Sequence, residues 1–287
     1  MKIVVTGGAG KAGRWIVREL TTGDDGRTVH DVLVFDQASE AETDHVRYLA
    51  GDVRDQGQVF EALAGSDAVI HLAGVARHGI VPNEVTVRTN VMAAFNVHEA
   101  AWRLCIPRVV TMSSEAVMGW APGAWLREVP PDYLPLDEDH PLRPQDSYGV
   151  SKQAVEVIAR SYSEKAEMTT VILRPPRVVT PEELRSLRES KGIIPGRFAL
   201  FNYIDARDLA EACRLAVERP LSGCNVLFAG SGDSLVREPL CSLYPKLMPR
   251  IGKKAEALTE GRSSVSLEKI KEVLGWAPRY SWRSGPM

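Results

Sequence analysis

The fold is decided by the stretch Met1-Lys-Ile-Val-Val-Thr-Gly-Gly-Ala-Gly-Lys-Ala-Gly13, which opens the chain. Its run Ile3-Val-Val5 is short, apolar and β-branched, which is typical of a strand buried on both faces of a parallel sheet. A glycine-rich turn follows, and residues 14–20 form an amphipathic run that predicts a helix. Together these elements make a cradle for a pyrophosphate, because the backbone can approach closely and free N–H groups face the anion. By itself, a glycine triplet would also fit a plain tight turn.

Length and composition limit the possible size of the domain and the kinds of partner that the protein can have. The 287 residues suffice for one large α/β domain, or for a large domain with a smaller lobe. A formal net charge of -2 provides no basic field that would recommend a nucleic acid or an anionic membrane as partner. The apolar runs are shorter than the roughly 20 residues of a membrane helix, and we find no signal peptide before the first strand, so we expect a cytoplasmic protein. The four cysteines lack metal or redox spacing, which predicts reduced, mostly buried thiols and no metal site.

A second apolar run, residues 31–36, predicts a strand that ends in Asp36. A carboxylate there can accept both hydroxyls of an adenosine ribose, and its charge would repel a 2′-phosphate. NAD is therefore favoured over NADP, although a solvated aspartate at a strand end is the alternative. A third strand is predicted over residues 46–50, and Asp52 follows it. Asp52 could cap the helix expected over residues 58–63, or it could bond an adenine amino group.

Two further strands run into small or hydroxyl-bearing residues. Residues 67–74 predict a buried strand whose last residues, Ala73 and Gly74, leave room for a ligand at the crevice of the sheet. The strand predicted over residues 108–112 leads into Ser113-Ser114-Glu115. Hydroxyls at the carboxyl end of a central strand suit either catalysis or a helix cap, and the sequence leaves both interpretations open.

Tyr148 and Lys152 form a second chemical signal. The segment Trp120 to Pro144 is long and rich in proline and acidic residues, as is typical of lids and substrate walls. Tyr148-Gly-Val-Ser-Lys152 then opens a helix, and residues four apart lie on one helical face. An ammonium near the phenol would lower the pKa of the phenol from about 10 toward neutral pH, which would make it a proton donor and acceptor.

With the glycine turn, Asp36, Ser114, Tyr148 and Lys152 in this order, the sequence resembles the extended short-chain dehydrogenase/reductases, the NAD-dependent epimerase/dehydratase family. The likeness spans nearly the whole chain and includes residues 133–144, 173–175, 203–210 and 266–276. It implies an α/β fold, a seven-stranded doubly wound parallel sheet (Rossmann fold) with a small C-terminal substrate lobe. The implied NAD-binding domain covers residues 1–174, with a strand and helix near 203–228 returning to it; the lobe covers residues 175–202 and 229–287.

The resemblance also implies the role of each site residue. Tyr148 would be the acid/base on a substrate hydroxyl or carbonyl, and Lys152 would hold the nicotinamide ribose. Ser114 would bond the same substrate oxygen, with Asn90 supporting the site. The residues implied to bind the cofactor, NAD, are Gly7, Gly10, Lys11, Ala12, Gly13, Asp36, Asp52, Val53, Leu72, Ala73, Gly74, Asn90, Tyr148, Lys152 and Pro175. The helices that bear Asn90 and Lys152 usually form the dimer interface in this family, so a homodimer is implied.

Departures from the family pattern narrow the reaction. Sugar-nucleotide 4,6-dehydratases resemble one another in a Thr-Asp-Glu sequence at the positions of Ser114, Glu115 and Ala116, so the second carboxylate of that mechanism is missing here. Epimerases of the UDP-galactose type usually have an asparagine in place of Arg177. They also have a longer stretch where this chain has only residues 178–202, which leaves little material for a uridine diphosphate pocket.

The short lobe and its cations suggest a small and anionic substrate. Arg174 and Arg177 lie in the segment expected beside the substrate, and a guanidinium can clamp a carboxylate by two parallel hydrogen bonds. Arg177 could instead pair with an acidic residue of the segment from Trp120 to Pro144. Ser114 and Glu115 are the other predicted substrate ligands. Uronate dehydrogenases resemble this chain in length and layout.

The predicted function is NAD-dependent hydride transfer at a secondary alcohol or ketone of a sugar or sugar acid, with Tyr148 as the acid/base. Two alternatives remain open. The first is a nucleotide-sugar epimerase that keeps NAD tightly bound and returns the hydride to the same substrate. The second is a non-catalytic NAD-binding sensor, against which the joint presence of Ser114, Tyr148 and Lys152 argues.

Overall fold

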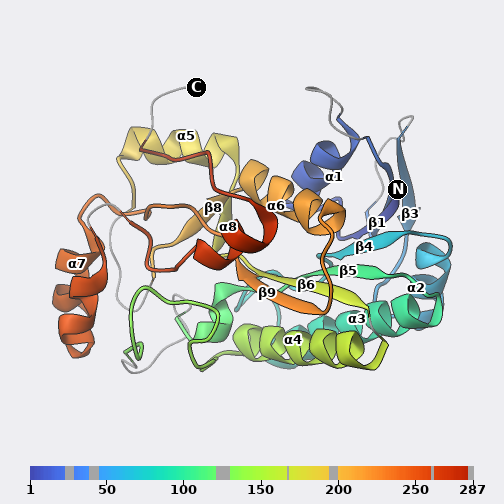
Figure 1. The fold of residues 1–287 in the computed structure, drawn as a ribbon, viewed down its shortest axis with the longest axis horizontal. Coiled ribbons are helices and arrows are strands. Elements are labelled where there is room, and N and C mark those ends of the chain that lie inside the picture. Colours follow the sequence, from blue (N-terminus) through green and yellow to red (C-terminus); the bar gives the residue numbers. More distant parts are fainter. Residues whose placement is uncertain are drawn as a thin grey trace.

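The computed structural model describes residues 1–22, 29–38, 45–120, 130–166, 168–193, 200–259 and 262–283. In these parts of the chain a parallel sheet of seven strands runs through the molecule in the order β3-β2-β1-β4-β5-β6-β9 (Figure 1). The strands are β1 (Lys2–Thr6), β2 (Asp31–Asp36), β3 (Val46–Ala50), β4 (Ala68–His71), β5 (Arg108–Met112), β6 (Thr169–Arg174) and β9 (Cys224–Phe228). The strand order reverses between β1 and β4, which confirms the predicted doubly wound sheet.

Helices cover both faces of the sheet, and the alternation of side chains along β1 shows why its apolar run is continuous. Ile3 and Val5 pack into the core beneath one helical layer, whereas Val4 packs into the core beneath the other. The first layer consists of α1 (Gly13–Thr21), α6 (Ala206–Glu218) and α8 (Glu268–Leu274) (Figure 1). The opposite layer consists of α2 (Gln56–Leu63), α3 (Asn83–Arg103) and α4 (Ser147–Ala166).

The start of α2 corrects one interpretation of Asp52. The helix begins at Gln56, and its N-cap is Asp55, whose carboxylate accepts the backbone N–H of Gln58 at 3.0 Å. The carboxylate of Asp52 instead pairs with the guanidinium of Arg54 at 2.5 Å. Asp52 therefore does not cap this helix.

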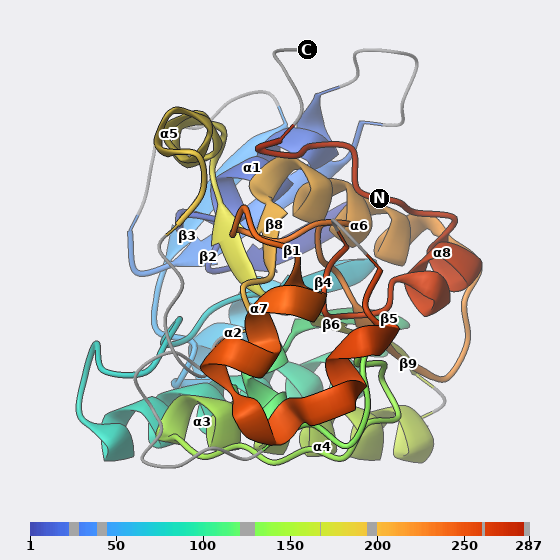
Figure 2. The same cartoon turned by 90° about the vertical axis from the view of Figure 1, so that its left-hand side faces the viewer.

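A smaller unit gathers at one end of the molecule, where α5 and α7 lie (Figures 1 and 2). It contains a two-stranded parallel sheet of β7 (Arg177–Val179) and β8 (Tyr203–Asp205), with α5 (Pro181–Ser190), α7 (Leu240–Leu247) and the 3-10 helix η3 (Pro249–Ala257). Its apolar core includes Phe201 and Tyr244 and reaches Val117 in the 3-10 helix η2 (Glu115–Met118). This unit therefore packs against the segment that follows β5, where site residues are expected.

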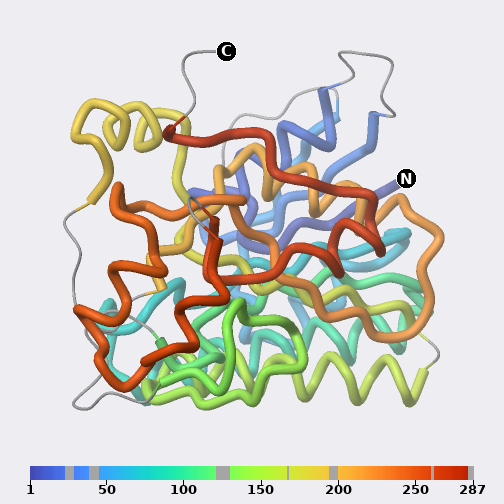
Figure 3. The backbone as a smooth tube through the Cα atoms, turned by 60° about the vertical axis from the view of Figure 1, so that its left-hand side comes forward, coloured from blue at the N-terminus to red at the C-terminus, as the bar shows by residue number. Residues whose placement is uncertain are grey.

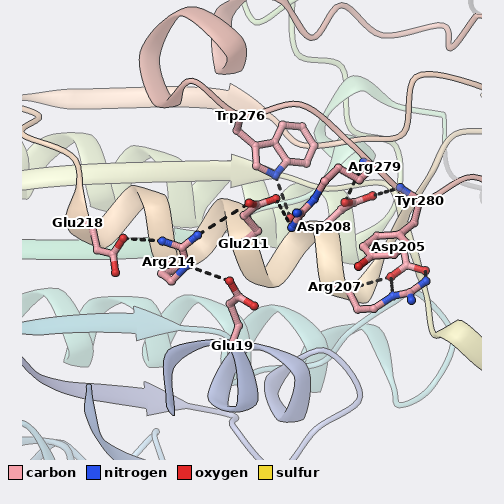
Figure 4. Close-up of polar contacts among 10 residues, drawn as sticks. All are labelled: Glu19, Asp205, Arg207, Asp208, Glu211, Arg214, Glu218, Trp276, Arg279 and Tyr280. Atoms are coloured by element: carbon pink, nitrogen blue, oxygen red, sulfur yellow. Dashed lines mark hydrogen bonds and ion pairs between the residues drawn. The ribbon is translucent and has the colours of Figure 1, made fainter. Parts of the chain in front are cut away.

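The last described residues run back along α6 (Figure 3). The carboxylate of Asp208 accepts the backbone N–H groups of Arg279 and Tyr280, each at 3.0 Å, and the indole of Trp276 donates to the Asp208 carbonyl (Figure 4). Farther along α6, Arg214 pairs with Glu19 of α1 at 2.9 Å. The three hydrogen bonds to Asp208 fix the C-terminal segment against α6, and the Arg214–Glu19 ion pair fixes α6 against α1.

The structure bears on two expectations drawn from composition, those about membrane-spanning helices and about the cysteines. None of the helices in the described ranges combines the length and the apolar character needed to cross a membrane. The four cysteines are free thiols, but only Cys213 is buried, and Cys105 is exposed. The expectation of mostly buried thiols is therefore wrong, because composition does not reveal on which side of an element a cysteine lies.

Candidate active site

The glycine turn lies at the point where the strand order reverses between β1 and β4. Gly7 has a φ of +76°, and a Cβ atom there would lie 2.7 Å from the backbone nitrogen of Ala73. A Cβ atom on Gly13 would lie 2.3 Å from the carbonyl oxygen of Gly7. The turn is thus folded tightly against the residues that follow β4, and it leads directly into the N-terminus of α1. This is the geometry of a pyrophosphate cradle.

Asp36 lies at the edge of this cradle. Its carboxylate accepts the backbone N–H of Ala9 at 3.1 Å and that of Gln37 at 2.7 Å. The turn and the end of β2 are therefore joined through one carboxylate, and its contact with a ribose stays a prediction. Asp52 and Val53 are placed by other contacts: Arg54 holds the pKa of the Asp52 carboxyl below its usual range, and the Val53 carbonyl accepts the side-chain amide of Asn96. Their contact with adenine stays a prediction.

Lys11 crosses from the glycine turn to the smaller unit. Its ammonium lies 2.5 Å from a carboxylate oxygen of Glu183 in α5 and donates to the carbonyl of Val178 at 2.8 Å. Gly10 and Ala12 flank it in the turn. The side chain is therefore engaged away from the turn, and its predicted pyrophosphate contact stays a prediction.

Tyr148 and Ser114 meet where α4 begins beside the end of β5. Asp146 accepts the backbone N–H groups of Tyr148 and Gly149 at 2.8 and 2.9 Å, which starts the helix at this point. The Ser114 hydroxyl lies close enough to the Tyr148 phenol to lower its pKa, and it accepts the N–H of Ala116 at 3.2 Å. Ser114 thus caps η2 and also lies beside Tyr148. A helix cap and a place in the candidate site, the two roles that the sequence left open, are therefore compatible for this one side chain.

The protonation behaviour of this pair differs from the prediction. Burial raises the pKa of Tyr148 to about 12, and the hydrogen bond from Ser114 only partly opposes it. The Lys152 ammonium lies 5.7 Å from the centre of the Tyr148 ring and donates to the carbonyl of Met112 at 2.8 Å. Burial lowers the pKa of Lys152 to about 8. The predicted lowering of the Tyr148 pKa is therefore wrong for the protein alone, because burial outweighs an ammonium that is bonded elsewhere.

Asn90 joins the loop after β4 to the helix that carries Tyr148. Its side-chain oxygen accepts the N–H of Val75 at 2.7 Å, and its amide donates to the Ser151 hydroxyl at 2.9 Å. Ser151 in turn donates to the carbonyl of Tyr148 at 2.7 Å. The segment Leu72 to Gly74 is held against α4 in this way, which agrees with the supporting role predicted for Asn90.

The two arginines predicted to bind substrate, Arg174 and Arg177, lie in different surroundings. Arg174 is 1% exposed, and its guanidinium makes two hydrogen bonds of 2.8 Å to the carboxylate of Glu156 in α4. Its predicted contact with substrate is therefore wrong, because its donors are engaged inside the protein. The Arg177 side chain is exposed and makes no hydrogen bond or close ion pair with a described residue, although its charge helps to lower the pKa of Glu183. Residues 121–129 of the segment from Trp120 to Pro144 lie outside the described residues, so Arg177 stays a predicted substrate ligand.

The model of the family described as "NAD dependent epimerase/dehydratase family" matches residues 3–226. The chain belongs to this family. Membership confirms both the resemblance and the prediction of NAD as cofactor. The Gly7, Gly13 and Asp36 geometry around β1 fits that cofactor, since it leaves a backbone cradle with a carboxylate at its rim.

Relatives of this epimerase/dehydratase family protein have several activities. It is 27% identical to the UDP-glucose 4-epimerase of Corynebacterium glutamicum over 98% of this chain and 92% of that protein. It is 31% identical to the dTDP-glucose 4,6-dehydratase of Streptomyces niveus over 61% of this chain, which spans only about half (53%) of the dehydratase. The structure of a glucuronic acid dehydrogenase from Chromohalobacter salexigens is 25% identical, with a TM-score of 0.70 over 98% of this chain and 85% of that one. The relatives are thus sugar-modifying enzymes of three reaction types.

Two residues at the site of this family member were missed by the sequence analysis. Glu156 follows Lys152 by one helical turn on the same face of α4, so the helical period could have found it. Asn202 donates to a carboxylate oxygen of Glu115 at 2.9 Å, and its own side-chain oxygen accepts the hydroxyls of Ser263 and Ser264. No local pattern reveals Asn202, because all of its partners lie far away in the sequence.

Glu115 gives a pH-dependent prediction. Burial raises the pKa of this carboxyl from 4.5 to about 8, although the hydrogen bond from Asn202 opposes the shift. The folded state therefore binds this proton more tightly than the unfolded state, so the stabilisation is complete below about pH 4.5 and is lost as the pH rises through about 8. We expect Glu115→Gln to raise the melting temperature relative to the parent at pH 9 more than at pH 5. Thermal melts at both values test this, and an equal difference at the two pH values would contradict it.

Proposed function

We propose that the protein is an NAD-dependent oxidoreductase that transfers hydride at a secondary alcohol or ketone of a sugar or sugar acid. The observation that carries the proposal is the pair of hydroxyls beside the end of β5, where Ser114 lies close enough to the phenol of Tyr148 to act on its pKa. Lys152 lies one turn farther along α4. A serine and a tyrosine whose hydroxyls lie this close can both reach a single substrate oxygen, as proton transfer at that oxygen requires.

In this proposal Tyr148 accepts the proton of the substrate hydroxyl while the carbon that bears the hydroxyl loses hydride. Ser114 keeps a hydrogen bond to the same oxygen as it becomes a carbonyl. NAD supplies the hydride acceptor and, when oxidised, a positive ring charge that favours ionised Tyr148. Lys152 adds a second positive charge 5.7 Å from the centre of the Tyr148 ring, and Asn90 keeps the loop after β4 against α4. The products are a ketone or lactone, NADH and one proton.

The relatives support a sugar substrate, and they are consistent with two reaction types, oxidation by a dehydrogenase and epimerisation. A glucuronic acid dehydrogenase aligns with nearly the whole chain, and the exposed cation of Arg177 suits a carboxylate. The UDP-glucose 4-epimerase also aligns over 98% of the chain, which keeps an epimerase with tightly bound NAD as the second candidate. Against the epimerase, residues 178–202 leave little material to hold a nucleotide.

Release of NADH separates these candidates. Purified protein is incubated with NAD and, in turn, neutral sugars, uronates and nucleotide sugars, while NADH absorbance and the sugar products are followed. A dehydrogenase accumulates NADH with the oxidised sugar, whereas an epimerase accumulates the epimer without free NADH. Tight NAD binding without any product would instead support the non-catalytic sensor.

We further propose a homodimer formed through α3 and α4. Large apolar side chains on these helices are exposed: Met92 at 42%, Phe95 at 40%, Val150 at 46% and Val157 at 61%. A face of this kind on two neighbouring helices suits a partner of equal shape, as a two-fold dimer supplies.

Val157→Glu places a charge in this face and is expected to convert the dimer to a monomer. Burial of an unpaired carboxylate costs several kcal/mol in a desolvated interface, roughly a 100-fold or greater loss of association. Sedimentation equilibrium measures the change. Ile80→Glu serves as the control, because Ile80 is 49% exposed but lies outside both helices. A Val157→Glu protein with the parent mass in solution would refute this interface.

A further inference from the structure

A buried ion pair joins the three elements that carry the proposed catalytic groups. Glu156 is 2% exposed and Arg174 is 1% exposed. One carboxylate oxygen of Glu156 accepts the hydroxyl of Ser113 at 2.6 Å and the Nε of Arg174 at 2.8 Å; the other accepts the Nη2 of Arg174 at 2.8 Å. The carboxylate therefore binds the end of β5 and the end of β6 at the same time, from its place on α4.

Each of these attachment points directly adjoins a residue of the proposed site. Ser113 precedes Ser114, Arg174 precedes Pro175, and Glu156 lies one helical turn beyond Lys152. The backbone completes the frame, because the N–H of Glu115 donates to the carbonyl of Pro175 at 3.0 Å. Rotation or translation of α4 would therefore move the Tyr148 phenol relative to Ser114 unless this carboxylate kept its partners.

Stability alone does not explain the pair. Two ions removed from water gain little net stabilisation, and apolar side chains of similar volume often serve as well or better. A charged triad has one property that apolar packing lacks: its hydrogen bonds have direction and length, so they set a position. The triad of Ser113, Glu156 and Arg174 thus suits a role in geometry more than in stability.

We propose that Glu156 is a positioning residue, which holds α4 against the ends of β5 and β6 so that Tyr148 meets Ser114. Arg174 and Ser113 are its two anchors. The inference rests on the proposed acid/base role of Tyr148. It assigns Arg174 to the framework of the site, in place of the substrate contact that its position in the sequence suggested.

The test replaces both ions by unbranched apolar side chains, Glu156→Met with Arg174→Met. We expect a melting temperature close to that of the parent, an unchanged affinity for NAD, and a kcat lower by about 10- to 100-fold, because a displacement of about 1 Å can cost a factor of this size. Removal of the Ser114 hydroxyl by Ser114→Ala should then cost less in the double variant than in the parent. A parent-like kcat in the folded double variant would overturn the proposal.

A second variant and two controls complete the design. Ser113→Ala removes one hydrogen bond and leaves the ion pair intact; it should lower kcat about threefold or more, and an unchanged kcat would also overturn the proposal, whether or not the double variant folds. Glu19→Met with Arg214→Met removes a partly buried pair between α1 and α6 and should leave kcat unchanged (Figure 4). Tyr148→Phe, measured in parallel, separates the two claims: retention of turnover there refutes the acid/base role of Tyr148 on which the inference rests, and loss there with retention in the double variant refutes only the positioning role.

Discussion

Replacement of Tyr148 by phenylalanine is expected to lower kcat by about 10²- to 10⁴-fold, the usual range for removal of a positioned acid/base. The substitution removes the phenol oxygen beside Ser114, and it leaves the ring at the start of α4. The affinity for NAD should fall much less than kcat, because Tyr148 is only one of the residues implied to bind NAD, and the glycine turn and Asp36 are untouched. Steady-state turnover of the substrate found in the NADH assay measures the first effect, and fluorescence titration with NAD measures the second.

Tyr162→Phe is the matched control for this experiment. Tyr162 lies on the same helix, far along α4 from Tyr148, and donates its hydroxyl to Glu99 at 2.6 Å. Its loss removes an equivalent hydrogen bond without touching the proposed site, so kcat should stay within about twofold of the parent. Equal turnover by the parent and by Tyr148→Phe would mean that another group moves the proton.

The strands and the glycine turn were predictable because their causes are local. β2 and β5 begin and end at the predicted residues 31–36 and 108–112, since each has a β-branched apolar centre that is largely buried in the sheet. The glycine turn follows from contacts within a few residues of Gly7 and from its positive φ. Helix ends were less accurate, as the Asp55 cap of α2 illustrates, because several nearby side chains compete to bond the first N–H groups.

The sequence indicated which residues form the candidate site, but it did not reveal how deeply they are buried or which distant residues they bond. The helical period placed Tyr148 and Lys152 on one face of α4, but it could not show how deeply that face is buried, and burial determines the sign of the Tyr148 pKa shift. Arg174 illustrates the same limit. Its partner Glu156 lies 18 positions away, and the two meet only because β5 and β6 are neighbours in the sheet and α4 packs across them.

The glycine turn offers the second large effect. Gly13→Ala would place a Cβ atom 2.3 Å from the carbonyl oxygen of Gly7 and 2.6 Å from the Cα of Gly8. Both are backbone atoms of the same turn, so no side chain can rotate to relieve the overlap, and the turn must open. Overpacking of this kind costs about 1–3 kcal/mol, which lowers the melting temperature by several degrees in a chain of this size. An opened turn no longer directs its N–H groups at one point, so we expect NAD to bind about 100-fold more weakly.

Gly10→Ala makes the same chemical change in the same turn. It separates two reasons for a glycine in this turn: the packing of the turn itself and the space that a bound pyrophosphate needs. A Cβ atom on Gly10 would meet only the carbonyl oxygen of Gly7, at 3.2 Å, a tight contact that a shift of a few tenths of an ångström relieves. We expect the melting temperature to stay within about 2 °C of the parent, while the affinity for NAD falls at least about tenfold, because the added methyl group occupies space that a pyrophosphate needs. Calorimetric titration with NAD and thermal melts of both variants test the pair. If Gly10→Ala bound NAD as tightly as the parent, the pyrophosphate could not lie against this part of the turn, and Gly13 would serve only the packing of α1 on β1.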